Sequence, residues 1–371
     1  MNKFISVIAA AALVGMLSAK EIKIGAIMPM SGAIAAYGQT AYEGLSLANK
    51  LEPTLKNGDT IKVILVDTKG DKVETANAAS RLITSEKVAA IVGELISTNT
   101  DQLASIAEKS KIPVVAPAAT NDRLTLKREF VSRVCFTDSF QGEVVANYAY
   151  SALGLKSAVI IIDEGQVYSI GLGKTFKDAF VKNGGKITKQ FYITAGSKDF
   201  KAIVAQIKSL NPDMIFLPLY HPEASMIAIQ SKEIGLNKPM FSGDGVANPT
   251  FLELGKSAVE GYMFTDTFDY GAPPTKRSEE FIKKYEKATG KKEMASFTAL
   301  GADAYFLIID AMNKCENPED GVCVNKQIKS AKGFEGVSGV INMLPSGDPV
   351  RSAVIKEVKE GKFIYKATVN P

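Results

Sequence analysis

Short polar side chains follow two apolar, strand-like runs of this 371-residue chain. The run 88–92 leads into Gly93-Glu94-Leu95-Ile96-Ser97-Thr98-Asn99-Thr100, and the run 112–116 leads into Pro117-Ala118-Ala119-Thr120. Ser97 and Thr98 are good N-cap residues for a helical pattern over 101–109, and a helix start offers free backbone N–H groups to an anion. Either segment alone is typical of an ordinary cap. Together they predict a site where two strand ends present hydroxyls and amides to one small ligand.

Asp244 could supply the opposite charge. It follows a third strand-like run, in Ser242-Gly243-Asp244-Gly245, where the glycines let backbone come close to a ligand. A carboxylate in this position suits an ammonium group, although the same motif is equally typical of a simple turn. Tyr37, Tyr168 and Tyr220 also follow strand-like runs and offer flat walls with a polar edge. This set of residues suits a small zwitterion.

The chain offers few residues for catalysis. Its one histidine is His221, and hydrolases built on Ser/His/Asp or Cys/His sets need an imidazole that has partners. No Gly-x-Ser-x-Gly elbow occurs, and no second metal ligand stands close to His221 in the sequence. Zinc sites made of Cys or His clusters are excluded, because the chain has too few cysteines and histidines to form them. We therefore expect no enzyme, no metal site and no cofactor, and we expect His221 at the surface or on the rim of a site.

Gly171-Leu172-Gly173-Lys174-Thr175 is similar to the end of a phosphate-binding loop. The full pattern, Gly-x4-Gly-Lys-Thr, needs a glycine at position 168, where the chain has Tyr168. We therefore reject nucleotide binding. The motif instead predicts a helix start whose glycines allow close approach to an opposing lobe.

The first residues are typical of a secretory signal peptide. Lys3 precedes an apolar run over 4–17, which ends in the small residues Ser18 and Ala19 ahead of two charged residues. Cleavage is expected after Ala19, so that residues 1–19 are removed. No other stretch approaches the roughly 20 apolar residues of a membrane span.

Charge and cysteine content further narrow the class of protein to which the chain can belong. The formal net charge is 44 − 40 = +4, and both signs alternate along the chain, as in 283–287. That pattern is typical of a solvated helix face and argues against nucleic acid as a partner. Cys315 and Cys323 flank a short polar loop in a chain bound for an oxidising compartment, which predicts a disulfide between them. Cys135 lies in the apolar run 131–136 and is expected to be a small core residue.

Apolar, β-branched runs alternate with amphipathic segments along most of the chain. This alternation predicts an α/β fold with doubly wound parallel sheets, which bind ligands beyond the carboxyl ends of their strands. About 350 mature residues exceed one comfortable core, so two domains are expected. Strands are predicted at 22–27, 61–66, 88–92, 112–116, 158–162, 186–193, 214–217 and 240–241, with helices at about 37–51, 73–85, 101–109, 173–182, 200–210 and 222–234. Two runs, 353–358 and 363–369, flank Glu360-Gly361-Lys362 as the strands of a hairpin would.

Across essentially the whole mature chain, these segments resemble those of one protein family. The chain is similar to the periplasmic leucine/isoleucine/valine-binding proteins, the solute receptors of ABC importers. The resemblance rests on Ile24-Gly25-Ala26-Ile27-Met28-Pro29-Met30-Ser31-Gly32, Tyr37-Gly38, the segment 93–100, Pro117-Ala118-Ala119-Thr120, Phe140-Gln141-Gly142, Tyr220-His221-Pro222-Glu223 and Gly243-Asp244-Gly245-Val246-Ala247-Asn248. It implies a type 1 periplasmic binding fold, with two doubly wound lobes joined by a three-segment hinge.

The resemblance also implies where the lobes begin and end. Lobe one is expected to hold residues 20–139 and 268–345, and lobe two residues 140–267 and 346–371. The linkers then fall near Asp138-Ser139, Thr267-Phe268 and Pro345-Ser346.

Each polar site residue takes a role from the same resemblance. Ser97 matches the family's carboxylate-binding serine, and Thr120 matches the threonine that touches both ends of the zwitterion. Thr98 adds a further hydroxyl. Asp244 stands at the place of the acidic ammonium partner, where some members carry the longer glutamate.

The remaining positions match backbone acceptors and pocket walls. The carbonyls of Leu95 and Ala118 match the family's ammonium acceptors, and its pocket aromatics fall on Tyr37, Tyr168 and Tyr220. The implied function is capture of leucine, isoleucine or valine between two closing lobes in the periplasm, by a monomer that delivers it to an ABC permease. Another small amino acid, an amide or a carboxylate stays open as the ligand, and so does a role as a ligand-sensing receptor domain.

Overall fold

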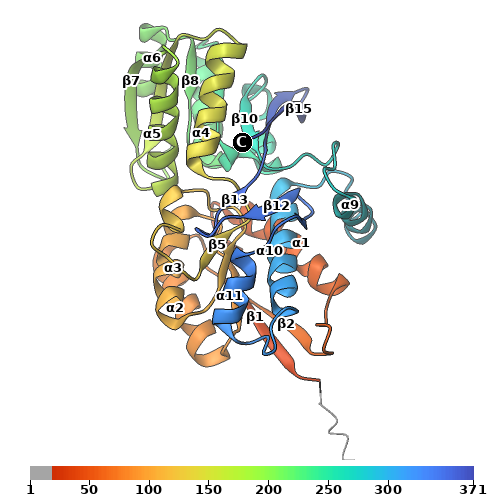
Figure 1. Ribbon diagram of the computed structural model, residues 1–371. Coiled ribbons are helices and arrows are strands. Elements are labelled where there is room, and N and C mark those ends of the chain that lie inside the picture. Colours follow the sequence, from red (N-terminus) through yellow and green to blue (C-terminus); the bar gives the residue numbers. More distant parts are fainter. Residues whose placement is uncertain (1–18) are drawn as a thin grey trace, which may run out of the picture.

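Two lobes lie one above the other, connected by a narrow waist (Figure 1). The computed structural model describes residues 19–371. The predicted signal peptide, residues 1–19, therefore lies outside the described residues except for its last position.

The first lobe is built on short apolar strands that helices cover on both faces. Its sheet has the order β2-β1-β3-β4-β5, and all neighbours are parallel. β1 enters the core because five consecutive residues at its end, 24–28, alternate little and are nearly all buried, as expected of a strand covered on both faces. The elements are β1 (Glu21–Met28), α1 (Ala35–Leu51), β2 (Thr60–Asp67), α2 (Lys72–Arg81), β3 (Ala90–Gly93), α3 (Ser97–Ser110), β4 (Val114–Ala116) and β5 (Val131–Arg133).

The second lobe repeats this layout and adds an antiparallel hairpin. Its sheet has the order β15-β14-β10-β9-β8-β6-β7, parallel from β7 to β10 and antiparallel from β10 to β15. The predicted doubly wound α/β architecture and the predicted hairpin are thus confirmed. The elements are α4 (Asp138–Asn147), β6 (Ser157–Asp163), α5 (Val167–Lys182), β7 (Lys186–Ile193), α6 (Lys201–Leu210), β8 (Met214–Phe216), α7 (His221–Glu233), β9 (Met240–Ser242), α8 (Pro249–Gly255), β10 (Met263–Asp266), β14 (Ala353–Lys359) and β15 (Lys362–Val369).

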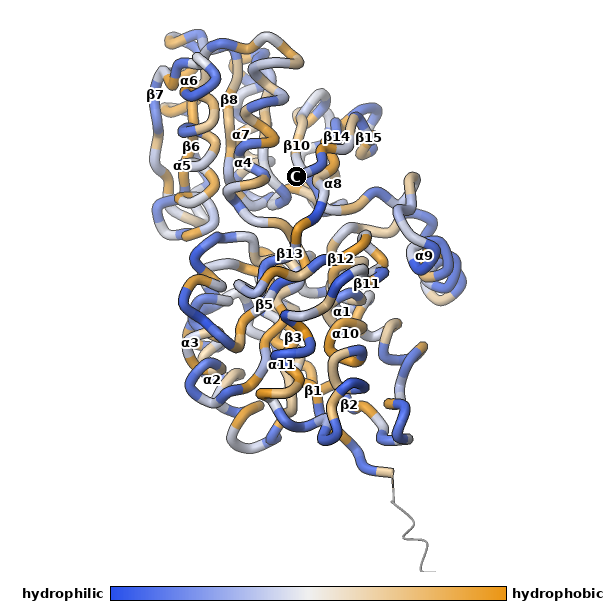
Figure 2. The backbone as a smooth tube through the Cα atoms, in the orientation of Figure 1, coloured by the Kyte–Doolittle hydropathy of each residue, from blue (hydrophilic) through white to orange (hydrophobic). Residues whose placement is uncertain are grey.

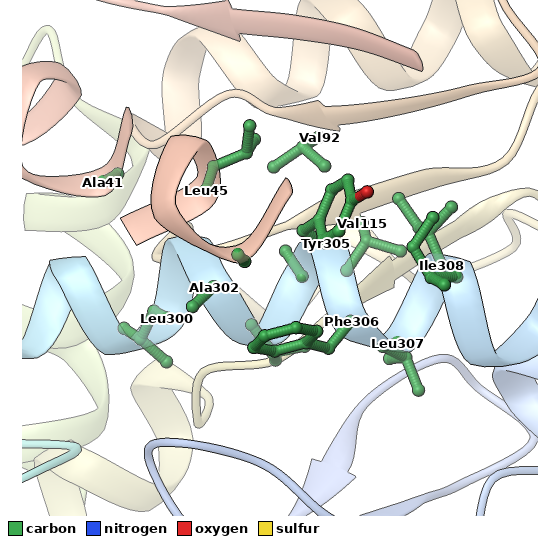
Figure 3. Close-up of a cluster of buried hydrophobic side chains, with 14 of the residues drawn as sticks. Ala41, Leu45, Val92, Val115, Leu300, Ala302, Tyr305, Phe306, Leu307 and Ile308 are labelled. Carbon is green, nitrogen blue, oxygen red and sulfur yellow. The ribbon is translucent and has the colours of Figure 1, made fainter. Parts of the chain in front are cut away.

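The chain between β10 and β14 returns to the first lobe. It forms α9 (Lys276–Thr289), α10 (Ser296–Met312), α11 (Gly321–Lys329), β11 (Phe334–Glu335), β12 (Val340–Met343) and β13 (Pro349–Val350). α10 is buried on nearly every side and packs along α1, with Val92 and Val115 of the sheet in the same cluster (Figure 3). Each large apolar side chain buried there contributes about 1.5–3 kcal/mol. α9, by contrast, lies at the edge of the molecule and is largely hydrophilic (Figure 2).

The chain passes between the two sheets three times, after β5, after β10 and after β13. The buried guanidinium of Arg351 ties these passages together. It donates to the carbonyl oxygen of Val134 on the first passage, to that of Thr267 on the second at 3.3 Å, and to that of Ser338 at 2.8 Å. Lobe boundaries are defined by which residues move together when the lobes open and close, so the boundaries given above stay a prediction.

The structure joins the Sγ atoms of Cys315 and Cys323 at 2.04 Å, consistent with the predicted disulfide, and Cys135 is buried and free. We expect protein purified without reductant to carry one bridge and one free thiol, because the eight-residue separation closes without rearranging any strand. Intact-mass measurement after alkylation, with and without reductant, checks this. Three alkylated thiols in the unreduced, denatured sample would reject the pairing.

None of the helices within residues 19–371 is both long enough and apolar enough to cross a bilayer.

Candidate ligand-binding site

A small cavity lies between the two lobes, at the carboxyl ends of both sheets. The space between its lining atoms amounts to about 240 Å³, so the two lobes lie close together around it. All predicted site residues except Thr98 line it, and each of them follows the end of a strand. The lining residues are Tyr37, Leu95, Ile96, Ser97, Ala118, Thr120, Tyr168, Tyr220, Asp244, Gly245 and Phe297. Three lining residues lie outside the predicted set: Ile96 and Gly245 stand in the motifs described above, whereas Phe297 comes from a segment that the sequence did not single out.

The start of α3 forms the anion side of the cavity. Ile96 is the N-cap, and Ser97 and Thr98 occupy the first helical positions, so the predicted N-cap role of these two residues is wrong. Their backbone N–H groups still belong to the first turn, which has no partners within the helix. The Thr120 hydroxyl faces the same space, is buried, and forms no well-aligned hydrogen bond within residues 19–371, although it lies near the Asp138 carboxyl and lowers the pKa of that group. A carboxylate placed here would satisfy both kinds of donor.

Glu94 braces the two residues that precede this helix. Its Oε2 atom accepts hydrogen bonds from the N–H groups of Leu95 at 2.8 Å and of the N-cap residue Ile96 at 2.6 Å. Its Oε1 atom accepts from the Thr68 hydroxyl at 2.8 Å. Burial raises the pKa of Glu94 to about 7. Glu94 therefore fixes the segment ahead of α3, and its hydrogen bonds use neither the Ser97 nor the Thr98 N–H group.

Asp244 lies across the cavity from α3, in a short 3₁₀ turn after β9. It is 3% exposed, and its Oδ1 atom accepts a hydrogen bond from Gln141 Nε2 at 3.2 Å. Burial and, to a smaller extent, the nearby carboxyl of Asp138 raise the pKa of Asp244 to about 8, whereas the hydrogen bond from Gln141 opposes the shift. A ligand ammonium would supply the missing positive charge.

The raised pKa values predict how stability depends on pH. Asp244, with a pKa of about 8, and Asp138, at about 7, hold protons in the folded state at pH values where the unfolded chain has released them. The folded state then binds more protons, so the free energy of unfolding falls as pH rises from about 4 through about 8. We expect the ligand-free protein to melt at a higher temperature at about pH 6 than at about pH 8.5. Circular-dichroism melts of wild type and Asp244→Asn check this, and equal pH dependence in both would contradict it.

Aromatic rings close the cavity on its other sides. Tyr168 and Tyr220 stack with ring centroids 5.1 Å apart, and Tyr37 meets Phe297 at 5.2 Å. The Tyr37 hydroxyl donates to the Gly245 carbonyl at 2.5 Å and accepts from the backbone N–H of His221 at 3.1 Å. Tyr37 belongs to lobe one and its two partners to lobe two. The ring therefore serves both as a wall and as a contact between the lobes.

Of the two positions expected for His221, at the surface or on the rim of a site, the surface position is wrong, because the side chain is 1% exposed and lies beneath Tyr37, a residue of the cavity lining. The correction has a physical reason: the residue starts α7 and its ring packs edge-on against the Tyr37 ring, 4.8 Å between centroids. Burial lowers its pKa to about 4, so the imidazole is neutral at physiological pH.

Further hydrogen bonds join the rims of the two lobes. The Thr98 hydroxyl donates to Gln166 Oε1 at 2.8 Å and accepts from the Val167 N–H at 3.1 Å, so the structure places Thr98 at the rim rather than in the lining. Asn121 Nδ2 donates to the Val167 carbonyl at 2.7 Å. A Cβ atom on Gly171 would collide with that same amide nitrogen, so the glycine permits the close approach that the sequence predicted. It lies inside α5, not at its start.

Nothing in the described part of the chain gathers three or more His, Cys, Asp or Glu side chains in a metal-binding arrangement. The residues that line the cavity can hold a small zwitterion by hydrogen bonds and one ion pair.

Several known proteins are similar to this chain. A family model described as a periplasmic binding protein matches residues 21–362. A Leu/Ile/Val/Thr-binding protein of Salmonella typhimurium is 30% identical over 338 residues, which is 90% of each chain. A solved leucine-binding protein from Thermotoga maritima is 39% identical with a TM-score of 0.92, covering 94% of this chain and 99% of that one. A branched-chain amino acid transporter substrate-binding protein from Streptococcus pneumoniae, solved in complex with isoleucine, is 29% identical with a TM-score of 0.89, covering 95% and 100%.

Proposed function

This chain belongs to the periplasmic binding protein family, a family of solute receptors and not of enzymes, and from that membership we propose that it captures leucine, isoleucine or valine for an ABC importer. One observation carries the proposal: within the cavity lining a single charged side chain, Asp244, faces a helix start and an unpaired hydroxyl across apolar walls. A second charged group would be needed to select an acidic or basic side chain.

Each part of an α-amino acid has a partner in this arrangement. The carboxylate lies against the first turn of α3, with the hydroxyls of Ser97 and Thr120. The ammonium pairs with Asp244 and donates to the carbonyl oxygens of Leu95 and Ala118. The aliphatic side chain packs among aromatic rings, those of Tyr37, Tyr168, Tyr220 and Phe297.

Binding is coupled to closure of the lobes. Ligand first contacts the α3 side in lobe one, and lobe two then brings Asp244, Tyr168 and Tyr220 over it. The closed form is favoured because these contacts exist only there. Closure buries both charged ends, so each must be fully hydrogen-bonded, or affinity collapses. No covalent bond is made or broken.

The cellular location and the partner of the protein follow from the same proposal. The chain is exported after loss of residues 1–19 and works in the periplasm, where a disulfide between Cys315 and Cys323 is stable. It acts as a monomer and presents its closed form to a membrane permease. Receptors for another small amino acid, an amide or a carboxylate share this mechanism, and a ligand-sensing receptor domain is the other alternative.

We expect a branched aliphatic amino acid to raise the melting temperature of the mature protein. At 100 times its dissociation constant, a ligand that binds only the folded state adds about 2.7 kcal/mol to the free energy of unfolding. The measurement is a thermal-shift screen of the amino acids on protein that has been unfolded and refolded, since that cycle removes ligand carried over from the cell.

The screen also discriminates among the alternatives. A shift with another small solute but none with leucine, isoleucine or valine would show the ligand assignment to be wrong. Glycine and glutamate serve as controls, because glycine lacks the aliphatic side chain and glutamate carries a second charge.

A further inference from the structure

Gln141 lies under the ammonium side of the cavity and is completely buried, on the first turn of α4. Its Nε2 atom donates to Asp138 Oδ1 at 2.9 Å and to Asp244 Oδ1 at 3.2 Å. Its Oε1 atom accepts from the backbone N–H of Asp244 at 3.1 Å and from the Thr265 hydroxyl at 3.0 Å. A glutamine amide has two donor hydrogens and two acceptor lone pairs, so all of its capacity is used.

These four bonds fix the orientation of the amide. The Asp244 N–H can only donate, so it needs the amide oxygen, and the Thr265 hydroxyl donates to the same atom. The amide nitrogen is then left to the carboxyl groups of Asp138 and Asp244. A flipped amide would set its nitrogen against the Asp244 N–H. Gly243 leaves the room for this contact, because a Cβ atom there would meet Gln141 Oε1 and the Tyr168 hydroxyl.

The contacts hold Asp244 at both its backbone and its side chain. Within residues 19–371, Gln141 is the side-chain amide that donates to Asp244, whose carboxyl also contacts the Tyr168 hydroxyl, and Gln141 separates this carboxyl group from that of Asp138. Asp138 and Gln141 lie on the first passage between the sheets, whereas Thr265 is on β10, directly before the second. The Gln141 amide thus links Asp244, the charged residue of the cavity, to two of the three passages between the sheets.

We infer that Gln141 is the positioning residue that aims the Asp244 carboxylate at the ligand ammonium and keeps Asp138 from competing for it. The inference rests on the proposed function for its ligand chemistry, an α-ammonium group. A residue that acts in this way affects affinity through Asp244. A residue that merely fills space affects stability whether or not Asp244 is charged.

The test compares Gln141→Met with Gln230→Met, using calorimetric titration of leucine. Methionine keeps the length of the side chain and removes both polar atoms. Gln230 is a matched control, since it is 5% exposed and bonds Phe200 N–H and the Lys198 carbonyl in lobe two, away from the cavity. We expect Gln141→Met to weaken leucine binding by about ten- to a hundredfold, the usual effect of a hydrogen bond to a charged group, and Gln230→Met to leave it within about twofold.

A double-mutant cycle separates positioning from packing. In the Asp244→Asn background, Gln141→Met is expected to cost less than about threefold in affinity, because the carboxylate that it positions is gone. Equal losses in both backgrounds would overturn the inference. Gln141→Glu gives a second signature: its binding should be weakest at high pH and recover on acidification, when the new carboxyl regains a proton to donate.

A measurement without ligand keeps the inference independent of the ligand assignment. If wild type binds no leucine, isoleucine or valine, the proposed function is wrong, but the inference about Gln141 can still be tested. The carboxyl ¹³C signal of Asp244, assigned with Asp244→Asn, is then titrated in ligand-free wild type and Gln141→Met. A higher Asp244 pKa in the variant supports the positioning role, because the bond that lowers it is lost, and an unchanged titration overturns it.

Discussion

Asp244→Asn should weaken amino-acid binding far more than Ser97→Ala does. Removing the carboxylate leaves a ligand ammonium buried without its counter-ion, and truncating one partner of a buried charge pair typically costs about 2–5 kcal/mol. Ser97→Ala removes one hydroxyl, for which the usual cost is about 0.5–1.5 kcal/mol, and the backbone N–H groups of α3 remain. Calorimetric titration of leucine against both variants measures the difference.

The comparison needs a control for a general effect of removing a negative charge. Asp178→Asn provides it, because Asp178 is exposed on α5 and, within residues 19–371, pairs with Lys174 alone. Circular dichroism confirms that each variant is folded. Wild-type affinity in Asp244→Asn would mean that Asp244 is a turn residue, as one interpretation of its sequence allows, and that the ammonium lies elsewhere.

Most of the cavity lining could be predicted because it depends on topology. In a parallel α/β sheet the carboxyl ends of neighbouring strands meet at one edge, so Ser97 after β3 and Thr120 after β4 converge without any knowledge of side-chain packing. Asp244 follows β9 of the other sheet, so its place opposite them depends on how the two lobes face each other, which the family resemblance implied. The structure brings all three residues to one cavity. Their roles as ligand contacts stay a prediction.

Other parts of the site depend on packing, which the pattern of residue types does not show. Phe297 reaches the cavity from the start of α10, a helix that is apolar on nearly all sides and so lacks the periodic stripe that marks an amphipathic helix. No sequence pattern marks Glu94 or Gln141 as part of the site either. They are polar residues in buried positions whose hydrogen bonds exist only in the folded chain.

The start of α3 shows how tertiary contacts override a local propensity. Serine and threonine favour the N-cap because their hydroxyls accept from the first amides of a helix. Here the Ile96 carbonyl accepts from the Asn99 and Thr100 N–H groups, so the helix begins at Ser97 and the two hydroxylated residues enter its first turn. Their hydroxyls bond other segments instead, since that of Ser97 accepts from the Asn121 N–H at 3.2 Å and that of Thr98 donates to Gln166 at 2.8 Å.

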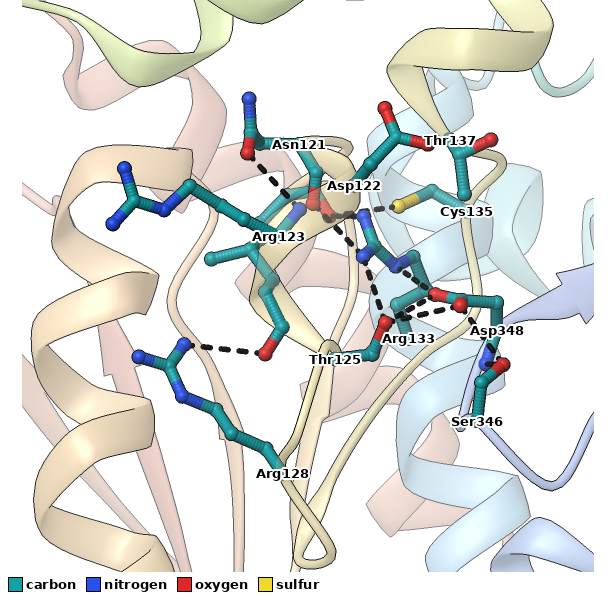
Figure 4. Close-up of polar contacts among 12 residues, drawn as sticks. Asn121, Asp122, Arg123, Thr125, Arg128, Arg133, Cys135, Thr137, Ser346 and Asp348 are labelled. Atoms are coloured by element: carbon teal, nitrogen blue, oxygen red, sulfur yellow. Dashed lines mark hydrogen bonds and ion pairs between the residues drawn. The ribbon is translucent and has the colours of Figure 1, made fainter.

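The hinge region also bears on the site, through Arg133. This guanidinium is 1% exposed and donates to the carbonyl oxygens of Ala119 at 2.9 Å and Asn121 at 2.9 Å, the two residues that flank Thr120 (Figure 4). Its Nε atom forms an ion pair with Asp348 Oδ1 at 2.7 Å, although the angle is poor for a hydrogen bond. Asp348 lies just before the third passage between the lobes. Arg133 therefore links the loop that carries Thr120 to the hinge.

Asp348→Ala is accordingly expected to destabilise the protein by about 3–5 kcal/mol, the usual cost of leaving a buried charge without its partner. Asp178→Ala breaks an ion pair of the same kind, but its two side chains are 71% and 54% exposed, so its effect should stay below about 1 kcal/mol. Urea unfolding of the two variants and wild type measures both values. Because the Arg133 contacts hold both neighbours of Thr120, leucine affinity should fall in Asp348→Ala and not in Asp178→Ala. If the two variants unfold at the same urea concentration, Arg133 is adequately satisfied by backbone carbonyls alone, and its ion pair does not support the site.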